Sequence, residues 1–113
     1  MEDDLVQSGR FARLAIRGRR SGETRSVSVG FVEEPDGSIL VAAGGPDVAW
    51  ALNLLADPDC TVTIGERSFA ARAEPLDDDD PRRGQTVREL ILRYGTPSER
   101  LGSGLVFSIR PIG

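Results

Sequence analysis

The stretch FARLAIRGRRSGETRSVSVGF, residues 11–31, carries the pattern that predicts the fold of this chain. Apolar residues alternate with other residues from Phe11 to Arg17 and again from Ser26 to Phe31, which is typical of strands that bury one face. Between them lies the segment Gly18–Arg25, with three arginines and two glycines in eight residues. The stretch therefore predicts two short strands joined by a positively charged turn.

The Gly18–Arg25 segment has the chemistry of an anion-binding loop. Glycine lets a backbone turn sharply and approach a ligand closely. Guanidinium groups present forked donors that match phosphate or carboxylate, and the hydroxyls of Ser21 and Thr24 add neutral donors. A charged hairpin that is merely solvated has the same composition, so the segment by itself leaves both interpretations open.

The alternating pattern continues along the rest of the chain. The turn Glu34–Gly37 has proline and Asp-Gly chemistry and predicts a hairpin between the second and third strands. Gly65 and Glu66 predict another turn, between the fourth and fifth strands. The strands after the first two are expected at residues 38–43, 60–64, 68–73 and 105–109.

Two helices are expected between these strands. The first has Asp47 as its N-cap and ends before Pro58. Its apolar stripe is expected to consist of Val48, Leu52 and Leu55, with Ala51 beside them. The second begins at Pro81 and ends at Gly95, with a stripe of Val87, Leu90, Ile91 and Tyr94. Aspartates favour the positive end of a helix, so we interpret the four at residues 77–80 as a solvated helix start and not as a metal site.

Length and composition limit the fold class. A chain of 113 residues with 39% hydrophobic residues and thirteen glycines suits one domain, residues 1–113, with a modest core. Helices that interrupt a series of consecutive strands argue against a doubly wound parallel sheet. We therefore expect a mainly β (α+β) fold, a small barrel of about six mostly antiparallel strands with two or three short helices.

Composition also excludes several classes of function. The chain has no histidine and one cysteine, Cys60, which removes histidine-dependent catalytic triads, histidine metal sites and internal disulfides. Its net charge of −4 argues against general attraction to nucleic acid or anionic membranes. Yet all fourteen basic residues are arginine, and five of them lie within residues 13–25. An acidic protein therefore keeps one local concentration of positive charge.

Simple patterns also predict where the protein is located in the cell and whether Cys60 is buried. No apolar run approaches the roughly 20 residues needed to span a bilayer. The first four residues, MEDD, are acidic and unlike a secretion signal, so we expect a soluble, cytoplasmic protein. Cys60 lies in an alternating strand pattern and is expected to be a small buried apolar residue.

The order of motifs along the chain is more informative than any single motif. The Gly18–Arg25 segment is followed by a hairpin, by VAAGG at residues 41–45, by WALNLLADP at 50–58 and by VTIG at 62–65. This series resembles the deazaflavin-dependent nitroreductase family, whose members are split β-barrels related to flavin reductases and to pyridoxamine-phosphate-oxidase-like folds. The resemblance runs from about residue 11 to residue 73, and more faintly to the last strand.

The resemblance implies a site for coenzyme F420, a deazaflavin with a phosphodiester and an oligoglutamate tail. It implies that the phosphate and tail are held by Arg19, Arg20, Ser21 and Arg25. It further implies that the ring lies along Ala43, Gly44 and Gly45, with Trp50 and Asn53 near the ribityl chain and phosphate. The implied activity is that of an F420H2-dependent oxidoreductase, of nitroreductase or quinone-reductase type, that passes a hydride to a small electron-poor acceptor.

Several points stay open at the level of the sequence. Tyr94, the only tyrosine, stands where family members often carry a tyrosine-bearing segment that lines the substrate pocket, but it also falls on an apolar helix stripe. A catalytic role and a packing role are therefore both considered. Family members often carry a longer N-terminal helix that helps close the substrate side, and whether this chain leaves an active substrate pocket stays open. The alternatives to an F420 reductase are a reductase that uses flavin mononucleotide (FMN), a non-catalytic carrier of a cofactor or small ligand, and a self-association module. A homodimer through an exposed sheet edge is compatible with each of them.

Overall fold

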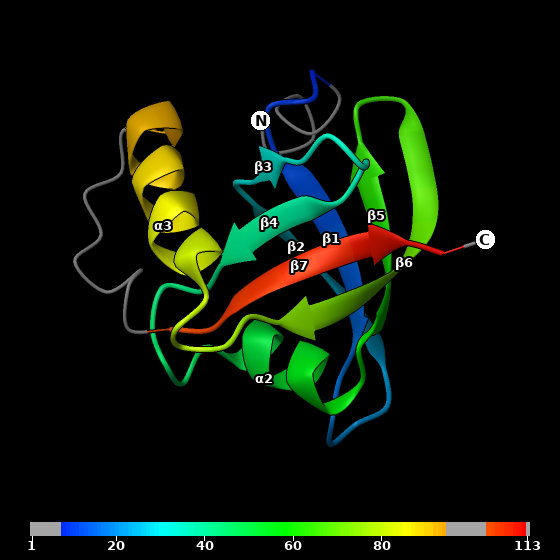
Figure 1. Cartoon of the computed structure of the whole chain (residues 1–113). Helices are drawn as coiled ribbons and strands as arrows, with labels where there is room; N and C mark the ends of the chain where they lie inside the picture. The colour runs from blue at the N-terminus through cyan, green and yellow to red at the C-terminus, as the bar shows by residue number, and fades with distance from the viewer. Residues whose placement is uncertain (1–7, 95–103, 113) are drawn as a thin grey trace.

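The computed structural model describes residues 8–94 and 104–112, which contain seven strands and two helices (Figure 1). In chain order they are β1 (Ala12–Arg17), β2 (Thr24–Val29), β3 (Val32–Glu33), β4 (Ile39–Ala42), α2 (Ala49–Ala56), β5 (Asp59–Ile64), β6 (Arg67–Pro75), α3 (Pro81–Tyr94) and β7 (Val106–Pro111). Every strand pair among them is antiparallel. The prediction of a mainly β, antiparallel fold is confirmed, with one short strand more than expected.

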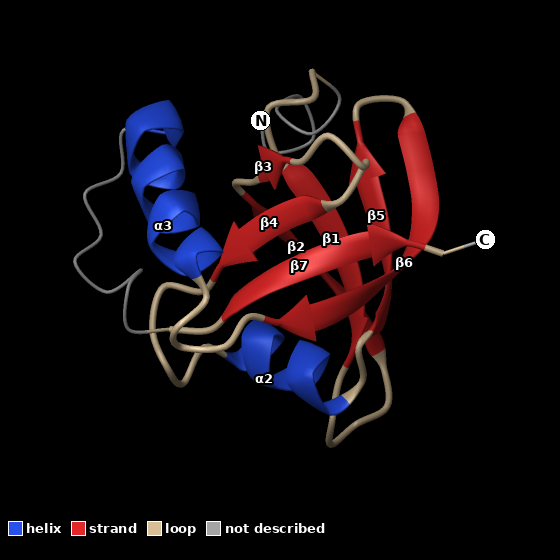
Figure 2. Ribbon diagram, in the orientation of Figure 1, coloured by secondary structure: helices blue, strands red, loops and turns tan. Residues whose placement is uncertain are grey.

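The sheet curls because its two edge strands are consecutive in the sequence. The strand order is β2-β1-β5-β6-β7-β4-β3, so β2 and β3 form opposite edges. A flat sheet of this size would separate these edges by roughly 29 Å, at about 4.8 Å per strand. Only Gly30 and Phe31 separate the two strands in the chain, and they span far less than that distance. The edges must approach each other, which gives the split-barrel architecture (Figure 2).

The inside of the curled sheet forms the main hydrophobic core. Buried residues alternate along β1 and β5, and the register sets Leu14 opposite Val62 and Ile16 opposite Cys60. Helix α2 lies at one end of the barrel and adds Ala51 and Leu54 to this core (Figure 2). The inward faces predicted for the first, fourth and fifth strands are therefore confirmed.

The second predicted strand divides into two in the structure. Pairing with β1 starts at Thr24, two residues earlier than expected, and β2 ends at Val29. Gly30 and Phe31 then carry the chain across the gap between the sheet edges, and β3 begins at Val32. Phe31 is still buried as predicted, but as a linking residue and not as part of a regular strand.

The predicted hairpin between β3 and β4 is present, although β3 has only two residues. Its turn places Gly37 at φ 89°, a conformation that favours glycine. Asp36 accepts a hydrogen bond from the backbone N–H of Ser38 at 2.9 Å, which lowers the pKa of the Asp36 carboxyl below its ordinary value. The Asp-Gly chemistry seen in the sequence thus forms the turn as expected.

Helix α2 differs from the prediction at its start and in its buried face. Its N-cap is Val48, in an extended conformation with no side-chain cap bond, and not Asp47. The fully buried residues are Ala51 and Leu54, whereas Leu55 is 47% exposed. The sequence AWALNLLA is apolar almost all round, so no single stripe is marked by composition. The contact with the barrel end selects the face.

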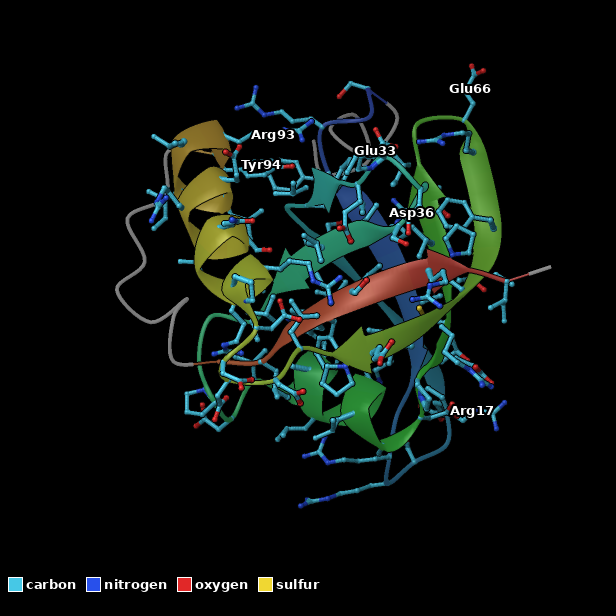
Figure 3. The ribbon with its side chains drawn as sticks, viewed as in Figure 1. Arg17, Glu33, Asp36, Glu66, Arg93 and Tyr94 are labelled. Atoms are coloured by element: carbon cyan, nitrogen blue, oxygen red, sulfur yellow. The ribbon has the colours of Figure 1, made fainter. Side chains whose placement is uncertain are left out.

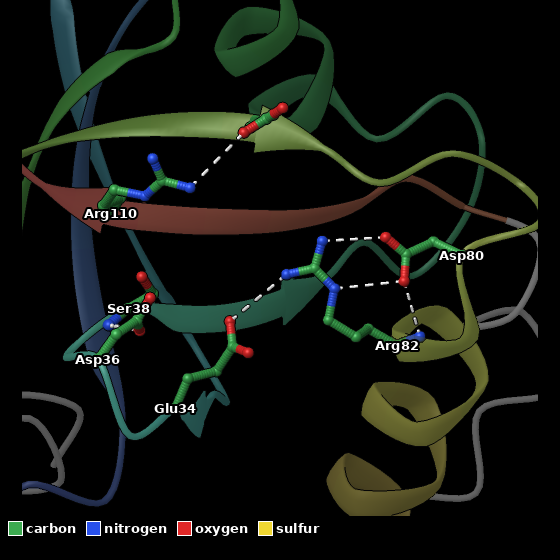
Figure 4. A network of polar contacts seen from close by, with 7 residues as sticks. Glu34, Asp36, Ser38, Asp80, Arg82 and Arg110 are labelled. Atoms are coloured by element: carbon green, nitrogen blue, oxygen red, sulfur yellow. Dashed lines mark hydrogen bonds and ion pairs between the residues drawn. The ribbon is translucent and has the colours of Figure 1, made fainter.

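Helix α3 begins with an aspartate cap and a proline. The carboxylate of Asp80 accepts a hydrogen bond from the backbone N–H of Arg82 at 2.9 Å, and Pro81 occupies the first helical position, where no donor is needed. The guanidinium of Arg82 also binds the same carboxylate at 2.9 Å and lies 3.8 Å from Glu34 (Figure 4). Bonding to Arg82 lowers the pKa of Asp80. The sequence-based interpretation of this segment as a helix start is confirmed.

The inner face of α3 packs beside β3 and β4 (Figure 1). Thr86 and Leu90 are buried on it, and Leu92 on the other side is 73% exposed. The members of the predicted stripe are all buried or partly buried: Val87, Leu90, Ile91 and Tyr94. The predicted end at Gly95 lies outside the described residues, as does the predicted loop at residues 95–104 except for its last residue. Neither described helix has the length and apolar character needed to cross a membrane.

Candidate functional site

The arginine turn between β1 and β2 is closed by its own backbone. The N–H of Gly18 donates to the carbonyl of Glu23 at 2.8 Å, and the N–H of Gly22 donates to the carbonyl of Gly18 at 3.0 Å. Gly22 has φ 74°, which a residue with a side chain rarely adopts. Residues 19–21 are therefore held at the tip of the turn with their side chains toward solvent. We call residues 18–22 the arginine turn.

Helix α2 is bonded directly to the arginine turn. The side-chain oxygen of Asn53 accepts two hydrogen bonds from Arg19, one from its backbone N–H at 3.2 Å and one from its guanidinium at 2.5 Å. The same guanidinium lies 3.5 Å from the carbonyl of Ala49. One residue before the turn, the Arg17 guanidinium lies 3.9 Å from the carboxylate of Asp57. These contacts fix the turn against the barrel end.

An open cavity of about 390 Å³ lies between the arginine turn and the end of α2. Its lining includes Arg17, Arg19 and Arg20 together with the backbone of both turn glycines. Arg20 is exposed and forms no hydrogen bond or ion pair with any residue that the structure describes. No described residue therefore competes with an anion for the donors of this guanidinium.

Ser21 lines this cavity and Arg25 does not, and both residues already have partners. The hydroxyl of Ser21 accepts a hydrogen bond from the backbone N–H of Glu23 at 3.2 Å. Arg25 belongs to β2 and not to the loop, and the register sets it opposite Ile16, on the inner side of the sheet. Its guanidinium lies 3.6 Å from the carboxylate of Glu23, and both side chains are largely exposed. Exposed pairs of this kind are worth little and separate readily for a stronger partner.

The Ala43–Gly45 segment follows β4 and is held from one side by the chain before β7. Ala43 is fully buried, and its N–H donates to the carbonyl of Leu105 at 2.8 Å. Gly44 is exposed, and a side chain at this position would meet no atom within 4 Å among the described residues. The segment thus combines a fixed backbone with free space on its outer side.

Trp50 and Asn53 lie on the same helix but have different surroundings. The Trp50 ring packs against Phe107 of β7, with ring centroids 6.2 Å apart and planes at 45°. Trp50 is partly buried at the edge of the core, while Asn53 contacts the arginine turn. The structure therefore connects Asn53 with Arg19 directly and gives Trp50 a packing contact.

Tyr94 is remote from the arginine turn. Figure 3 shows Tyr94 and Arg17 near opposite ends of the molecule. The Tyr94 hydroxyl donates to the carbonyl of Arg10 at 2.7 Å and accepts from the N–H of Phe31 at 3.0 Å. Its ring packs against Phe11 at a centroid distance of 4.9 Å. The hydroxyl is thus bound to backbone, which supports the packing role over the catalytic one.

The structure adds residues that the sequence analysis did not assign to the site. Arg17 and Asp57 line the cavity, and Arg17 could have been noticed because it directly precedes Gly18. Gly104 and Arg83 contact the surroundings of the Ala43–Gly45 segment from far along the chain. No local signal marks these two, since only folding brings them to this place.

The described residues at the cavity supply hydrogen-bond donors and positive charge. No group of three His, Cys, Asp or Glu side chains in the described residues could hold a metal ion. Burial, with the charges of Asp59 and Asp57, raises the pKa of the Cys60 thiol to about 11, so this thiol stays protonated at neutral pH. The described residues thus provide a cationic turn at the end of α2 and a glycine segment that precedes α2 in the chain.

Comparison with protein families gives one match that covers most of the chain. The sequence model of the family described as F420H(2)-dependent quinone reductase matches residues 5–100. An F420H(2)-dependent quinone reductase of Mycobacterium tuberculosis (strain H37Rv) is 30% identical over 71 residues, which are 60% of this chain and 48% of that protein. The chain spans about half the length of the curated relatives it matches.

Solved structures share the architecture at low sequence identity. An F420-H2 dependent reductase has a TM-score of 0.69 and is 22% identical, covering 89% of this chain and 94% of that chain. A heme storage protein of Vibrio cholerae has a TM-score of 0.73 and is 18% identical, covering 98% of this chain and 87% of that chain. These two likenesses establish the fold, and their different descriptions show that the fold alone does not select a ligand.

Proposed function

The chain belongs to the F420H(2)-dependent quinone reductase family, and we propose that it is an F420H2-dependent oxidoreductase with a small electron-poor acceptor of the quinone class as its substrate. The observation that carries this proposal is the exposed guanidinium of Arg20 at the cavity of the arginine turn, which has no partner among the residues that the structure describes. Membership of this family indicates F420 as the cofactor. The proposal places the anionic end of the cofactor at the arginine turn.

The arginine turn fits the phosphate and the glutamate tail of F420. Three arginines line the cavity, and one of them, Arg20, has no partner among the described residues. Ser21 lines the same cavity and Arg25 follows in β2, and the contacts that hold their side chains are one hydrogen bond and one exposed ion pair. Charge-assisted hydrogen bonds from guanidinium to phosphate or carboxylate are roughly twice as strong as neutral ones. These residues are therefore suited to an anion with several oxygens.

The Ala43–Gly45 segment fits a flat ring. Gly44 leaves open space on the outer side of a backbone that is fixed on its other side, so a ring can approach closely. Trp50 borders the core on the adjacent helix. When bound, reduced F420 supplies a hydride for the acceptor. The chain itself contributes binding, orientation and exclusion of water from the ring face.

The proposal is tested by titrating the protein with F420 and, separately, with FMN, followed by fluorescence. The variants are the wild type and Arg20→Ala combined with Arg25→Ala. Loss of two charge-assisted contacts should cost about 3 kcal/mol, or more than a hundredfold in affinity for F420. A control with Arg67→Ala and Arg88→Ala removes the same charge far from the turn and should bind like the wild type.

The outcomes separate the alternatives. Binding of F420 that collapses in the double variant but not in the control supports the cofactor and its place. Binding of FMN alone would make the protein a flavin-type split barrel. Binding of neither cofactor would overturn the reductase proposal in favour of a carrier or a self-association module. Reduction of a soluble quinone by F420H2 in the presence of the protein then tests the acceptor class.

Two further proposals concern assembly and location. Among the described strands β2 is an edge of the sheet, and an edge strand can pair with a second copy, so we propose a homodimer, to be checked by analytical ultracentrifugation. A single species at the monomer mass over the micromolar range would contradict it.

We also propose a cytoplasmic location, to be checked by fractionation of native cells.

A further inference from the structure

The Ala43–Gly45 segment rests against the backbone of Gly104. A Cβ atom built on Gly104 would lie 2.6 Å from the carbonyl oxygen of Ala43 and 2.7 Å from that of Gly45. Real Cβ atoms do not approach oxygen so closely, so only glycine permits this contact. The next residue, Leu105, accepts the N–H of Ala43 at 2.8 Å. The position of residues 104–105 therefore sets the position of the Ala43–Gly45 backbone.

Gly104 is in turn held by helix α3. The Arg83 guanidinium donates to the carbonyl of Gly104 at 3.0 Å, across 21 residues of sequence. Arg83 stands one turn from the capped start of the helix, where Asp80 and Pro81 fix the backbone. A guanidinium on a rigid helix is well suited to hold a carbonyl in place. This gives a continuous path of contacts from α3 through Gly104 to Gly45.

We propose that Arg83 and Gly104 are positioning residues for the cofactor ring, and that they act by holding the Ala43–Gly45 backbone. This inference rests on the proposed function, because it assigns the ring to that segment. Arg83 does not touch the cofactor in this scheme. Its guanidinium fixes Gly104, and the Gly104 backbone supports the surface on which the ring lies.

The first test compares Arg83→Met with Arg88→Met for binding of F420. Methionine keeps an apolar stem and removes the donors, and Arg88 is an exposed arginine of the same helix that serves as the control. We expect the dissociation constant of Arg83→Met to rise about tenfold, as for one lost hydrogen bond to a charged group, and that of Arg88→Met to stay within about twofold of the wild type. Arg83→Lys keeps one donor and should restore part of the affinity.

The salt dependence of binding separates positioning from direct contact. Direct pairing with the anionic tail is screened by salt, whereas the position of a backbone segment is not. Arg20→Ala should therefore flatten the dependence of affinity on salt, and Arg83→Met should leave its slope unchanged. A flattened slope in Arg83→Met would overturn the proposal and make Arg83 a tail ligand. Affinity equal to that of Arg88→Met would overturn it as well.

Hydrogen exchange of the free protein tests, without any cofactor, whether Arg83 and Gly104 hold the Ala43–Gly45 backbone in place. In Arg83→Met the amides of Gly44 and Gly45 should exchange faster than in Arg88→Met, and those of β1 and β5 should not change. Gly104→Ala should have the same local effect, with Gly84→Ala as its control because a side chain at Gly84 meets nothing within 4 Å. Unchanged exchange at Gly44 and Gly45 would overturn the proposal that Arg83 and Gly104 hold this backbone. If the exchange changes but the wild type binds no F420, the proposed function fails, whereas the support of the Ala43–Gly45 backbone by Arg83 and Gly104 is confirmed.

Discussion

Asn53 is the residue at which helix α2 and the arginine turn meet. The resemblance assigns both Asn53 and Arg19 to the cofactor, yet in the structure the side-chain oxygen of Asn53 is bonded twice to Arg19. Arg20 therefore has the freer guanidinium, and Arg19 is held by the helix. We infer that Asn53 contributes to binding by fixing the turn.

Replacing Asn53 should show whether it contributes to binding by fixing the arginine turn. Asn53→Ala removes the acceptor and should destabilise the protein by about 1 kcal/mol and weaken F420 binding several-fold, because the turn loses its attachment. Asn53→Asp keeps the acceptor and should keep the stability, but its charge should repel the anionic tail. Thermal melts and fluorescence titrations of both variants measure this. Equal F420 affinity in wild type and Asn53→Ala would contradict a positioning role.

Cys60 should make stability fall at alkaline pH. Its thiol has a pKa raised from 9.0 to about 11, so the folded state keeps its proton after the unfolded state has lost it. Stability should therefore decrease as pH rises from 9 to 11, by about 2–3 kcal/mol in total. Urea unfolding of the wild type and of Cys60→Val across this range tests it. The variant lacks the thiol and should show a smaller decrease, and parallel curves would refute the assignment.

At the scale of one element, the start of α3 depends on Asp80. Asp80→Ala removes the N-cap bond to Arg82 and should lower the urea midpoint of unfolding near neutral pH. The pKa of Asp80 is lowered, so its contribution is present above the ordinary carboxyl pKa and is lost as pH falls through the lowered value. The difference in urea midpoint between wild type and variant should vanish in acid. Asp78→Ala, in the same aspartate run, serves as the control and should change little.

At the scale of the whole molecule, the end of α3 binds the two residues, Gly30 and Phe31, that connect the edge strands β2 and β3. Tyr94 bonds to the backbone of Phe31, and the neighbouring Arg93 donates to the Phe31 carbonyl at 3.2 Å and covers its ring at 5.2 Å. A side chain on Gly30 would lie 2.7 Å from the Tyr94 ring. The two residues between the edge strands are therefore held from one side by α3.

Changes at this gap should lower stability without affecting the arginine turn. Tyr94→Phe loses its backbone bonds and Gly30→Ala forces the ring to move, and each should cost about 1–3 kcal/mol. Gly84→Ala, in open space on α3, should instead stabilise the protein by up to about 1 kcal/mol. Thermal melts give the stabilities, and titration with F420 should give an unchanged affinity for Tyr94→Phe. A loss of turnover in Tyr94→Phe well below its melting temperature would restore the catalytic role.

The sequence by itself determined six of the seven described strands and the inward faces of β1 and β5. Alternation of apolar residues is a local signal, and a one-residue error would turn the whole buried face outward, so the pattern admits one solution. The turns are equally local, since Gly22, Gly37 and Gly65 all have positive φ. The concentration of arginine in one turn likewise needs no structure to be seen.

Only the tertiary structure decided which distant residues meet. The buried face of α2 came from its contact with the barrel, because the helix is apolar almost all round. Asn53 reaches Arg19 across 34 residues, and Tyr94 reaches Phe31 across 63. Gly104 lies against Gly45 for the same reason. Such contacts depend on how a curled sheet brings its edges and ends together, and composition or spacing along the chain does not encode that closure.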